Sequence, residues 1–149
     1  MRTPCNARGR QSELCGLPVL IYLFLWMLQP SAQISFDFSS LTVGEGSMVI
    51  IYPTPVTEKI QFYNWFRGAD TSAKKMILGY VFDKEESVSY GPEYTGRESG
   101  EPDGALVITY VLKNYTSDYT LQMQLEGQSI QQATVHLTVS GKCFWQIMP

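Results

Sequence analysis

Short runs of β-branched and aromatic residues recur along residues 33–140, and glycine, proline and polar residues separate them. Runs of this length and composition are typical of β-strands. No window of helical length in this region keeps a 3.6-residue hydrophobic period. We therefore predict an all-β domain of about nine strands, a number typical of a two-sheet sandwich. The expected strands span residues 34–38, 41–43, 48–52, 60–66, 75–82, 105–111, 119–125 and 130–139, with short edge strands between 83 and 104.

The first 32 residues differ from the rest of the chain. Three arginines precede an uncharged apolar run at residues 17–28, and the small residues Ser31 and Ala32 follow it. This run is shorter than the ~20 residues that span a bilayer, but it has the length of a signal-peptide core. We expect residues 1–32 to be a signal peptide that is cleaved after Ala32, and a secreted, extracellular product without stable membrane insertion. The alternative is a short buried helix.

The cysteines limit the disulfides that this chain can form. Cys5 and Cys15 lie in the expected signal peptide, which leaves Cys143 in a short C-terminal tail, residues 141–149. One cysteine in an oxidising compartment forms no internal disulfide. Cys143 is therefore expected to be either a free thiol or an intermolecular bridge.

The charge balance argues against several partners. Removing three arginines and one glutamate from the 11 basic and 14 acidic residues leaves 8 against 13, a net charge of −5 for residues 33–149. Nucleic acids and anionic membranes are recognised by basic surfaces. We therefore expect no nucleic-acid partner.

Nothing in the sequence favours an enzyme. His136 is the only histidine, and strand alternation makes it an ordinary strand residue. The sequence contains no metal-ligand spacing and no nucleophile elbow. The glycine-rich stretch from Gly91 to Gly104 lacks phosphate-loop spacing and a following helix. We expect no catalytic residue, no metal and no cofactor.

Two aromatic residues favour one class of sandwich. Trp65 lies on the third major strand, where an immunoglobulin sandwich carries its core tryptophan. Tyr119 enters a strand directly after a loop, the place of a tyrosine corner. Leu121 stands where the usual cysteine would follow, and its partner strand offers Ile51 or Pro53. We predict an immunoglobulin V-type β-sandwich over residues 33–140, without the intersheet disulfide and with Trp65, Tyr119 and Leu121 in the core.

Six segments carry a more specific signature. They are Val43–Gly46 (V-G-E-G), Trp65–Gly68 (W-F-R-G), Ile77–Val81 (I-L-G-Y-V), Gly91–Glu98 (G-P-E-Y-T-G-R-E), Pro102–Leu106 (P-D-G-A-L) and Tyr119–Gln122 (Y-T-L-Q). In this order they resemble the N-terminal V-type domain of the carcinoembryonic-antigen-related cell adhesion molecules and pregnancy-specific glycoproteins. The resemblance runs from about residue 34 to residue 139, and it implies a domain that lacks the intersheet disulfide.

The resemblance also implies a protein-binding face. In this family the face is the sheet with the tryptophan strand, the two strands after it and the C-terminal hairpin, called the GFCC′ face. It supports adhesion between like and unlike members, and bacterial adhesins use it. Large apolar groups at Phe66, Met76 and Tyr80 are typical of interfaces, and the alternative is that they cover an ordinary sheet. Alternation places Met76 and Tyr80 on one side of their strand with Leu78. Matching to the family places these residues on the face: Phe66, Thr71, Ser72, Lys75, Met76, Gln122, Gln124 and Gln128.

The chain departs from the family pattern at several positions. The acidic partner expected for Arg97 is replaced by Tyr115, so we expect that salt bridge to be lost, and Asp118 is no obvious substitute. Contact residues for self-adhesion are changed at Phe66, Ser72 and Met76. Self-adhesion is therefore not assumed.

The sequon Asn114-Tyr115-Thr116 lies in a predicted loop, where we expect Asn114 to be glycosylated.

Together these features predict a secreted recognition domain that binds another protein as a soluble ligand or decoy. The expected partners are cell-surface adhesion molecules of the same family or microbial adhesins, and a homodimer remains open. Two alternatives also remain open: a structural subunit of an extracellular assembly linked through Cys143, and a truncated splice form with little function.

Overall fold

The computed structural model describes residues 19–25, 27, 33–83 and 85–141. The chain divides into two units, residues 1–32 and residues 33–149. In the first unit, residues 19–25 are helical. None of the described helices is long and apolar enough to cross a membrane.

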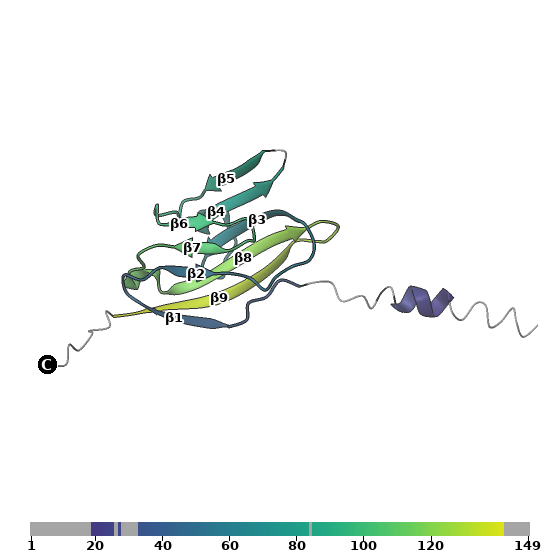
Figure 1. Ribbon diagram of the computed structural model, residues 1–149, viewed down its shortest axis with the longest axis horizontal. Coiled ribbons are helices and arrows are strands. Elements are labelled where there is room, and N and C mark those ends of the chain that lie inside the picture. The colour runs from purple at the N-terminus through teal and green to yellow at the C-terminus, as the bar shows by residue number, and fades with distance from the viewer. Residues whose placement is uncertain (1–18, 26, 28–32, 84, 142–149) are drawn as a thin grey trace, which may run out of the picture. The chain divides into compact units, whose positions relative to one another are not determined.

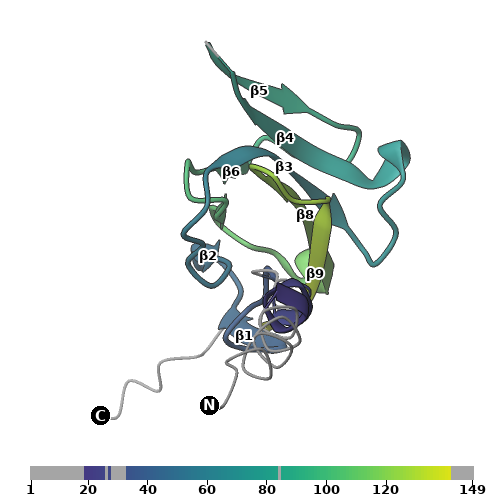
Figure 2. The ribbon, with the colours of Figure 1, turned by 90° about the vertical axis from the view of Figure 1, so that its right-hand side faces the viewer.

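The described part of the second unit forms two β-sheets (Figure 1). The larger sheet has the strand order β1-β9-β8-β3-β4-β5, and the smaller sheet has the order β2-β7-β6. In Figure 2, β2 and β6 lie on one side of the sandwich and β8 and β9 on the other. The strands are β1 (Ser40–Gly44), β2 (Val49–Ile51), β3 (Ile60–Arg67), β4 (Met76–Phe82), β5 (Glu86–Tyr90), β6 (Glu98–Gly100), β7 (Leu106–Ile108), β8 (Ser117–Leu125) and β9 (Gln131–Ser140), with 3-10 turns η1 (Ala73–Lys75) and η2 (Lys113–Tyr115).

These strands confirm the predicted V-type sandwich. All strand pairs are antiparallel except β1 and β9, which pair in parallel. The expected strand at residues 34–38 is wrong. That segment is held by isolated hydrogen bonds instead of a ladder: Ile34 N donates to Gln131 Oε1 at 2.7 Å, and Thr54 N donates to Ser35 O at 2.8 Å.

The core lies between the two sheets. Trp65, Leu121 and Ile51 are completely buried there, and the part of the chain that the structure describes contains no cysteine. The Trp65 indole N–H donates to the Gly104 carbonyl at 3.0 Å, which ties β3 to the loop before β7. Burying one large aliphatic side chain contributes about 1.5–3 kcal/mol, so residues such as Leu121 and Ile51 offset part of the missing disulfide's contribution.

The predicted common face of Met76, Leu78 and Tyr80 is wrong. Leu78 pairs with Trp65, but Met76 pairs with Phe66, because the register shifts between these two pairs and leaves Ile77 as an extra residue in β4. Leu78 and Tyr80 are buried in the core, where Tyr80 stacks on another tyrosine ring. A bulge breaks the two-residue alternation, so Met76 points to the opposite side of the sheet.

Candidate protein-binding face

The side chains of β3 alternate between the core and the opposite side of the larger sheet. Trp65 and Tyr63 are buried in the core, so Asn64 and Phe62 point outward. Their cross-strand partners on β4 and β8 share that side. We call this surface the outer face and define it by Phe62, Asn64, Met76, Gly79, Val81, Gln122 and Gln124.

Gly79 determines how the centre of the outer face is packed. A Cβ atom at this position would lie 2.5 Å from Asn64 Oδ1, 2.7 Å from Met76 Cε and 3.1 Å from Ser89 Oγ. The missing side chain therefore lets Asn64 and Met76 lie across the sheet. The result is an apolar thioether beside polar groups at the centre of the face.

Amide side chains extend the outer face along β8. Gln122 pairs in register with Asn64, and Gln124 pairs with Phe62. Gln124 Nε2 also donates to the Gln128 carbonyl at 3.5 Å, which connects the face to the β8–β9 turn. The three predicted glutamines therefore lie on or next to one continuous surface.

The other predicted contact residues lie in the loop before β4 and in the turn that it leads into. Ser72 donates through both its N–H and its hydroxyl to the Asp70 carboxylate, at 3.0 and 2.8 Å. Thr71 is the half-buried residue between them. Lys75 Nζ lies 3.7 Å from Glu93 Oε1. This loop is polar and borders the apolar centre of the outer face.

Phe66 offers little surface to a partner. It was matched to the face, but only 4% of it is exposed, and it pairs with Met76 and Thr120 at the bulge. By contrast, Val81 is 43% exposed on the same sheet. The sequence prediction missed Phe62, Asn64 and Val81. Strand alternation would have found the first two, because residues one and three positions before the core residue Trp65 point to the opposite side of the sheet.

A buried polar network supports the loop before β8. The Tyr119 hydroxyl donates to the Tyr115 carbonyl at 2.9 Å, the geometry of a tyrosine corner. The Tyr115 hydroxyl shares a 2.5 Å hydrogen bond with Thr95 Oγ1, which in turn donates to the buried Glu98 carboxylate at 2.9 Å. Burial raises the pKa of Tyr119 to about 12. The network joins two loops that are distant in sequence.

Arg97 contacts a backbone carbonyl and an aromatic ring instead of a carboxylate. Arg97 donates to the Tyr110 carbonyl at 2.8 Å and its guanidinium lies 5.4 Å from the Tyr110 ring centre; among the described residues no carboxylate pairs with it. Asp118 instead contacts His136, at 2.7 Å between Oδ1 and Nδ1. The described residues contain no cluster of three or more ligands that could hold a metal.

The sequon lies at the surface. Asn114 and Thr116 are exposed and flank a buried tyrosine in η2. The Asn114 carbonyl accepts a hydrogen bond from Arg67 Nη2, and Thr116 Oγ1 accepts one from Val139 N at 2.9 Å. These contacts hold the loop while the Asn114 side chain faces solvent. Cys143, the predicted thiol, lies outside the described residues.

Comparisons with known proteins agree with this architecture. Residues 39–140 match the model of the immunoglobulin V-set domain. The chain is 31% identical over 100 residues to "Cell adhesion molecule CEACAM16" of Rattus norvegicus, a match that covers 67% of this chain and 23% of that protein. The chain therefore spans about a quarter of the length of this curated relative. The matched immunoglobulin and cell-adhesion families are non-enzymatic.

Solved structures give the same result. Murine CEACAM1b superposes with a TM-score of 0.64 and 25% identity, over 73% of this chain and 53% of that one. A chain from the mouse coronavirus receptor-binding domain in complex with its murine receptor gives a TM-score of 0.61 and 26% identity, over 67% of this chain and 50% of that one. The first immunoglobulin-like domain of human CD48 gives a TM-score of 0.61 and 23% identity, over 75% of this chain and 89% of that one. This likeness shows the fold alone.

Proposed function

Because this chain belongs to the immunoglobulin V-set family and is a V-type domain of the carcinoembryonic-antigen-related kind, we propose that it is a secreted recognition domain. It binds another protein through the outer face and acts as a soluble ligand or decoy. Its partners are cell-surface adhesion molecules of the same family or microbial adhesins. No catalytic step is part of this function.

The observation that carries the proposal is the centre of the outer face. Met76 and Asn64 lie across Gly79, and Val81 is 43% exposed beside them. Apolar groups mixed with hydrogen-bonding amides, inside a polar border, are characteristic of the cores of protein interfaces. Methionine side chains also adapt to different partner surfaces.

A structural relative supports binding to proteins. The solved complex of a coronavirus receptor-binding domain with its murine receptor contains a chain similar to this one. The altered contact positions favour unlike partners over a second copy, because Phe66 is almost completely buried here. Binding to a second copy is therefore not part of the proposed function.

Binding can be tested with paired charge variants. The purified protein would be measured by interferometry against ectodomains of the adhesion family. Val81→Lys places a charge on the outer face, whereas Thr42→Lys places the same charge on the exposed edge strand β1. We expect the first variant to weaken binding about tenfold or more, as at interface hot spots, and the second to leave it unchanged.

Two results would contradict the proposal. One is the absence of binding to every ectodomain at ~100 μM, a weak affinity by the usual arithmetic, by protein whose circular dichroism shows a folded β-domain. The other is equal binding by both lysine variants, which would place the contact elsewhere on the domain.

Processing completes the proposed function. We propose that residues 1–32 are removed as a signal peptide and that Asn114 carries a glycan, because its side chain is exposed. Mammalian expression followed by mass spectrometry of the medium should find Gln33 as the N-terminus. Glycosidase treatment should shift the parent but not Asn114→Gln. A secreted product that still contains residues 1–32 would contradict the first part.

A further inference from the structure

Two adjacent hollows lie at the end of the sandwich where β2 leads into β3. The first has a volume of about 440 Å³ and the second about 510 Å³. Both are lined by Tyr52, Pro102 and Asp103, so they form one continuous depression, which we call the loop-end groove. Each volume falls within the ~300–1,000 Å³ typical of ligand sites.

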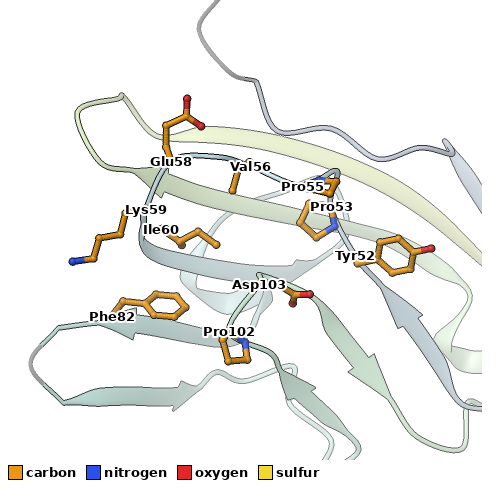
Figure 3. A pocket seen from close by; sticks show the side chains of 10 residues that line it. All are labelled: Tyr52, Pro53, Pro55, Val56, Glu58, Lys59, Ile60, Phe82, Pro102 and Asp103. Atoms are coloured by element: carbon orange, nitrogen blue, oxygen red, sulfur yellow. The ribbon is translucent and has the colours of Figure 1, made fainter.

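The walls of the loop-end groove are mainly apolar. In the first hollow, apolar side chains converge from the β2–β3 loop, the start of β3 and the end of β4: Pro53, Val56, Ile60 and Phe82 (Figure 3). In the second hollow, Ile50 is 44% exposed on β2. Exposed apolar surface of this kind, bordered by polar residues, is typical of interaction sites.

The charges of the groove are acidic where the two hollows meet. Asp103 lies between Pro102 and Tyr52, whereas Lys59 extends away from the hollow (Figure 3). One Asp103 oxygen accepts a hydrogen bond from Ala105 N at 3.0 Å, which leaves the second oxygen available. Glu101 lines the second hollow. Among the described residues, no lysine or arginine lies within ion-pair distance of either carboxylate.

We propose that the loop-end groove binds an extended segment of another protein in which residues i, i+2 and i+4 are apolar, basic and apolar. Side chains two residues apart point to the same side of an extended chain, about 6.6 Å apart. Such a segment places one apolar side chain in each hollow. It places its Lys or Arg at Asp103, the acidic residue that lines both hollows.

This site is separate from the outer face. The groove is built from β2, the loop after it, the loop before β7 and the end residues Ile60 and Phe82 of β3 and β4, none of which belongs to the outer face. The proposal therefore does not rest on the proposed function. Variants of each surface distinguish failure of one from failure of the other.

The probe is the peptide acetyl-Leu-Ser-Lys-Ser-Leu-amide, titrated into ¹⁵N-labelled protein and followed by NMR chemical shifts. We expect the amides of Ile50, Tyr52 and Asp103 to shift most. Replacing lysine by glutamate in the peptide should weaken binding by more than the loss of one ion pair, because attraction to Asp103 becomes repulsion. Replacing both leucines by serine should weaken binding about tenfold or more, because buried leucine contacts are lost.

Two protein variants complete the test. Asp103→Asn keeps an oxygen for Ala105 N and should raise the dissociation constant about two- to fivefold, the range of an exposed ion pair. Glu126→Gln is the control, because it makes the same charge change at an exposed turn outside the groove. Tyr52→Ser, at a half-exposed position, should also weaken binding, whereas the outer-face variant Val81→Lys should not.

Three results would overturn the proposal. They are equal binding of the lysine and glutamate peptides, an equal effect of Asp103→Asn and Glu126→Gln, and shifts confined to residues outside the groove. An equal effect of Asp103→Asn and Glu126→Gln would show that the peptide is attracted only by the net charge of the protein. Each result leaves the proposed function of the outer face intact.

Discussion

Replacing Tyr119 by phenylalanine tests how much the corner hydroxyl stabilises the sandwich. Tyr119 is 1% exposed, and its hydroxyl donates to the buried Tyr115 carbonyl at 2.9 Å. Phenylalanine keeps the ring and removes only this donor. A buried acceptor left without its partner costs about 1–3 kcal/mol. We expect the free energy of unfolding at pH 7, measured by urea denaturation with circular dichroism, to fall by that amount.

The same hydroxyl predicts a loss of stability in alkali. Burial raises the pKa of Tyr119 to about 12 from the ordinary 10.0. An unfolded tyrosine therefore loses its proton first, and stability decreases as the pH rises from about 10 to about 12. Two pKa units correspond to about 2.7 kcal/mol. The urea midpoint of Tyr119→Phe should therefore fall less steeply than that of the parent over this range.

An exposed tyrosine provides the control for Tyr119→Phe. Tyr52 is 49% exposed, so Tyr52→Phe should change the free energy of unfolding by less than about 0.5 kcal/mol. Burial also raises the pKa of Tyr63, but Tyr63 is present in every variant and cancels in the comparison. Equal stability of Tyr119→Phe and the parent at pH 7 would refute the role of the hydroxyl. Equal alkaline slopes would refute the pKa argument.

Two further substitutions test the core and the outer face. Trp65→Phe removes the donor to the Gly104 carbonyl and leaves unfilled volume, so we expect a loss of about 3 kcal/mol in urea denaturation; a loss below ~1 kcal/mol would contradict it. Gly79→Ala forces Asn64 and Met76 apart, so we expect about 1–2 kcal/mol of destabilisation and weaker partner binding. Unchanged stability and interferometry for this variant would show that the two side chains do not need their present packing.

The parts of the fold that depend on regular alternation could be predicted from the sequence. Tyr119 and Leu121 lie in the core two residues apart in β8, and Trp65 lies in the core two residues after Tyr63 in β3, before the register shift. The outward position of Met76 could not be predicted in this way, because the register between β3 and β4 shifts between Leu78 and Met76. A bulge leaves no clear mark in the composition of a strand, since it depends on how two strands pair.

The polar contacts were harder to predict than the core. The expected loss of a carboxylate partner for Arg97 agrees with the described ion pairs. The sequence did not indicate that Tyr115 would be buried and reach Thr95, because that contact joins residues twenty positions apart. Side-chain partners across loops depend on the tertiary fold and not on local pattern. The outer-face residues Asn64 and Val81 are identified by strand alternation and not by matching to the family.

The parallel pairing of β1 with β9 has a mechanical consequence. Five residue pairs, from Ser40 with His136 to Gly44 with Ser140, join the first and last strands of the domain. Tension applied through residues before β1 and after β9 would pull these parallel strands in opposite directions along their length. The ladder would then be loaded in shear, with its hydrogen bonds sharing the force instead of opening one at a time. We expect single-molecule pulling to show an abrupt rupture of the whole domain, whereas gradual extension at low force would contradict this arrangement.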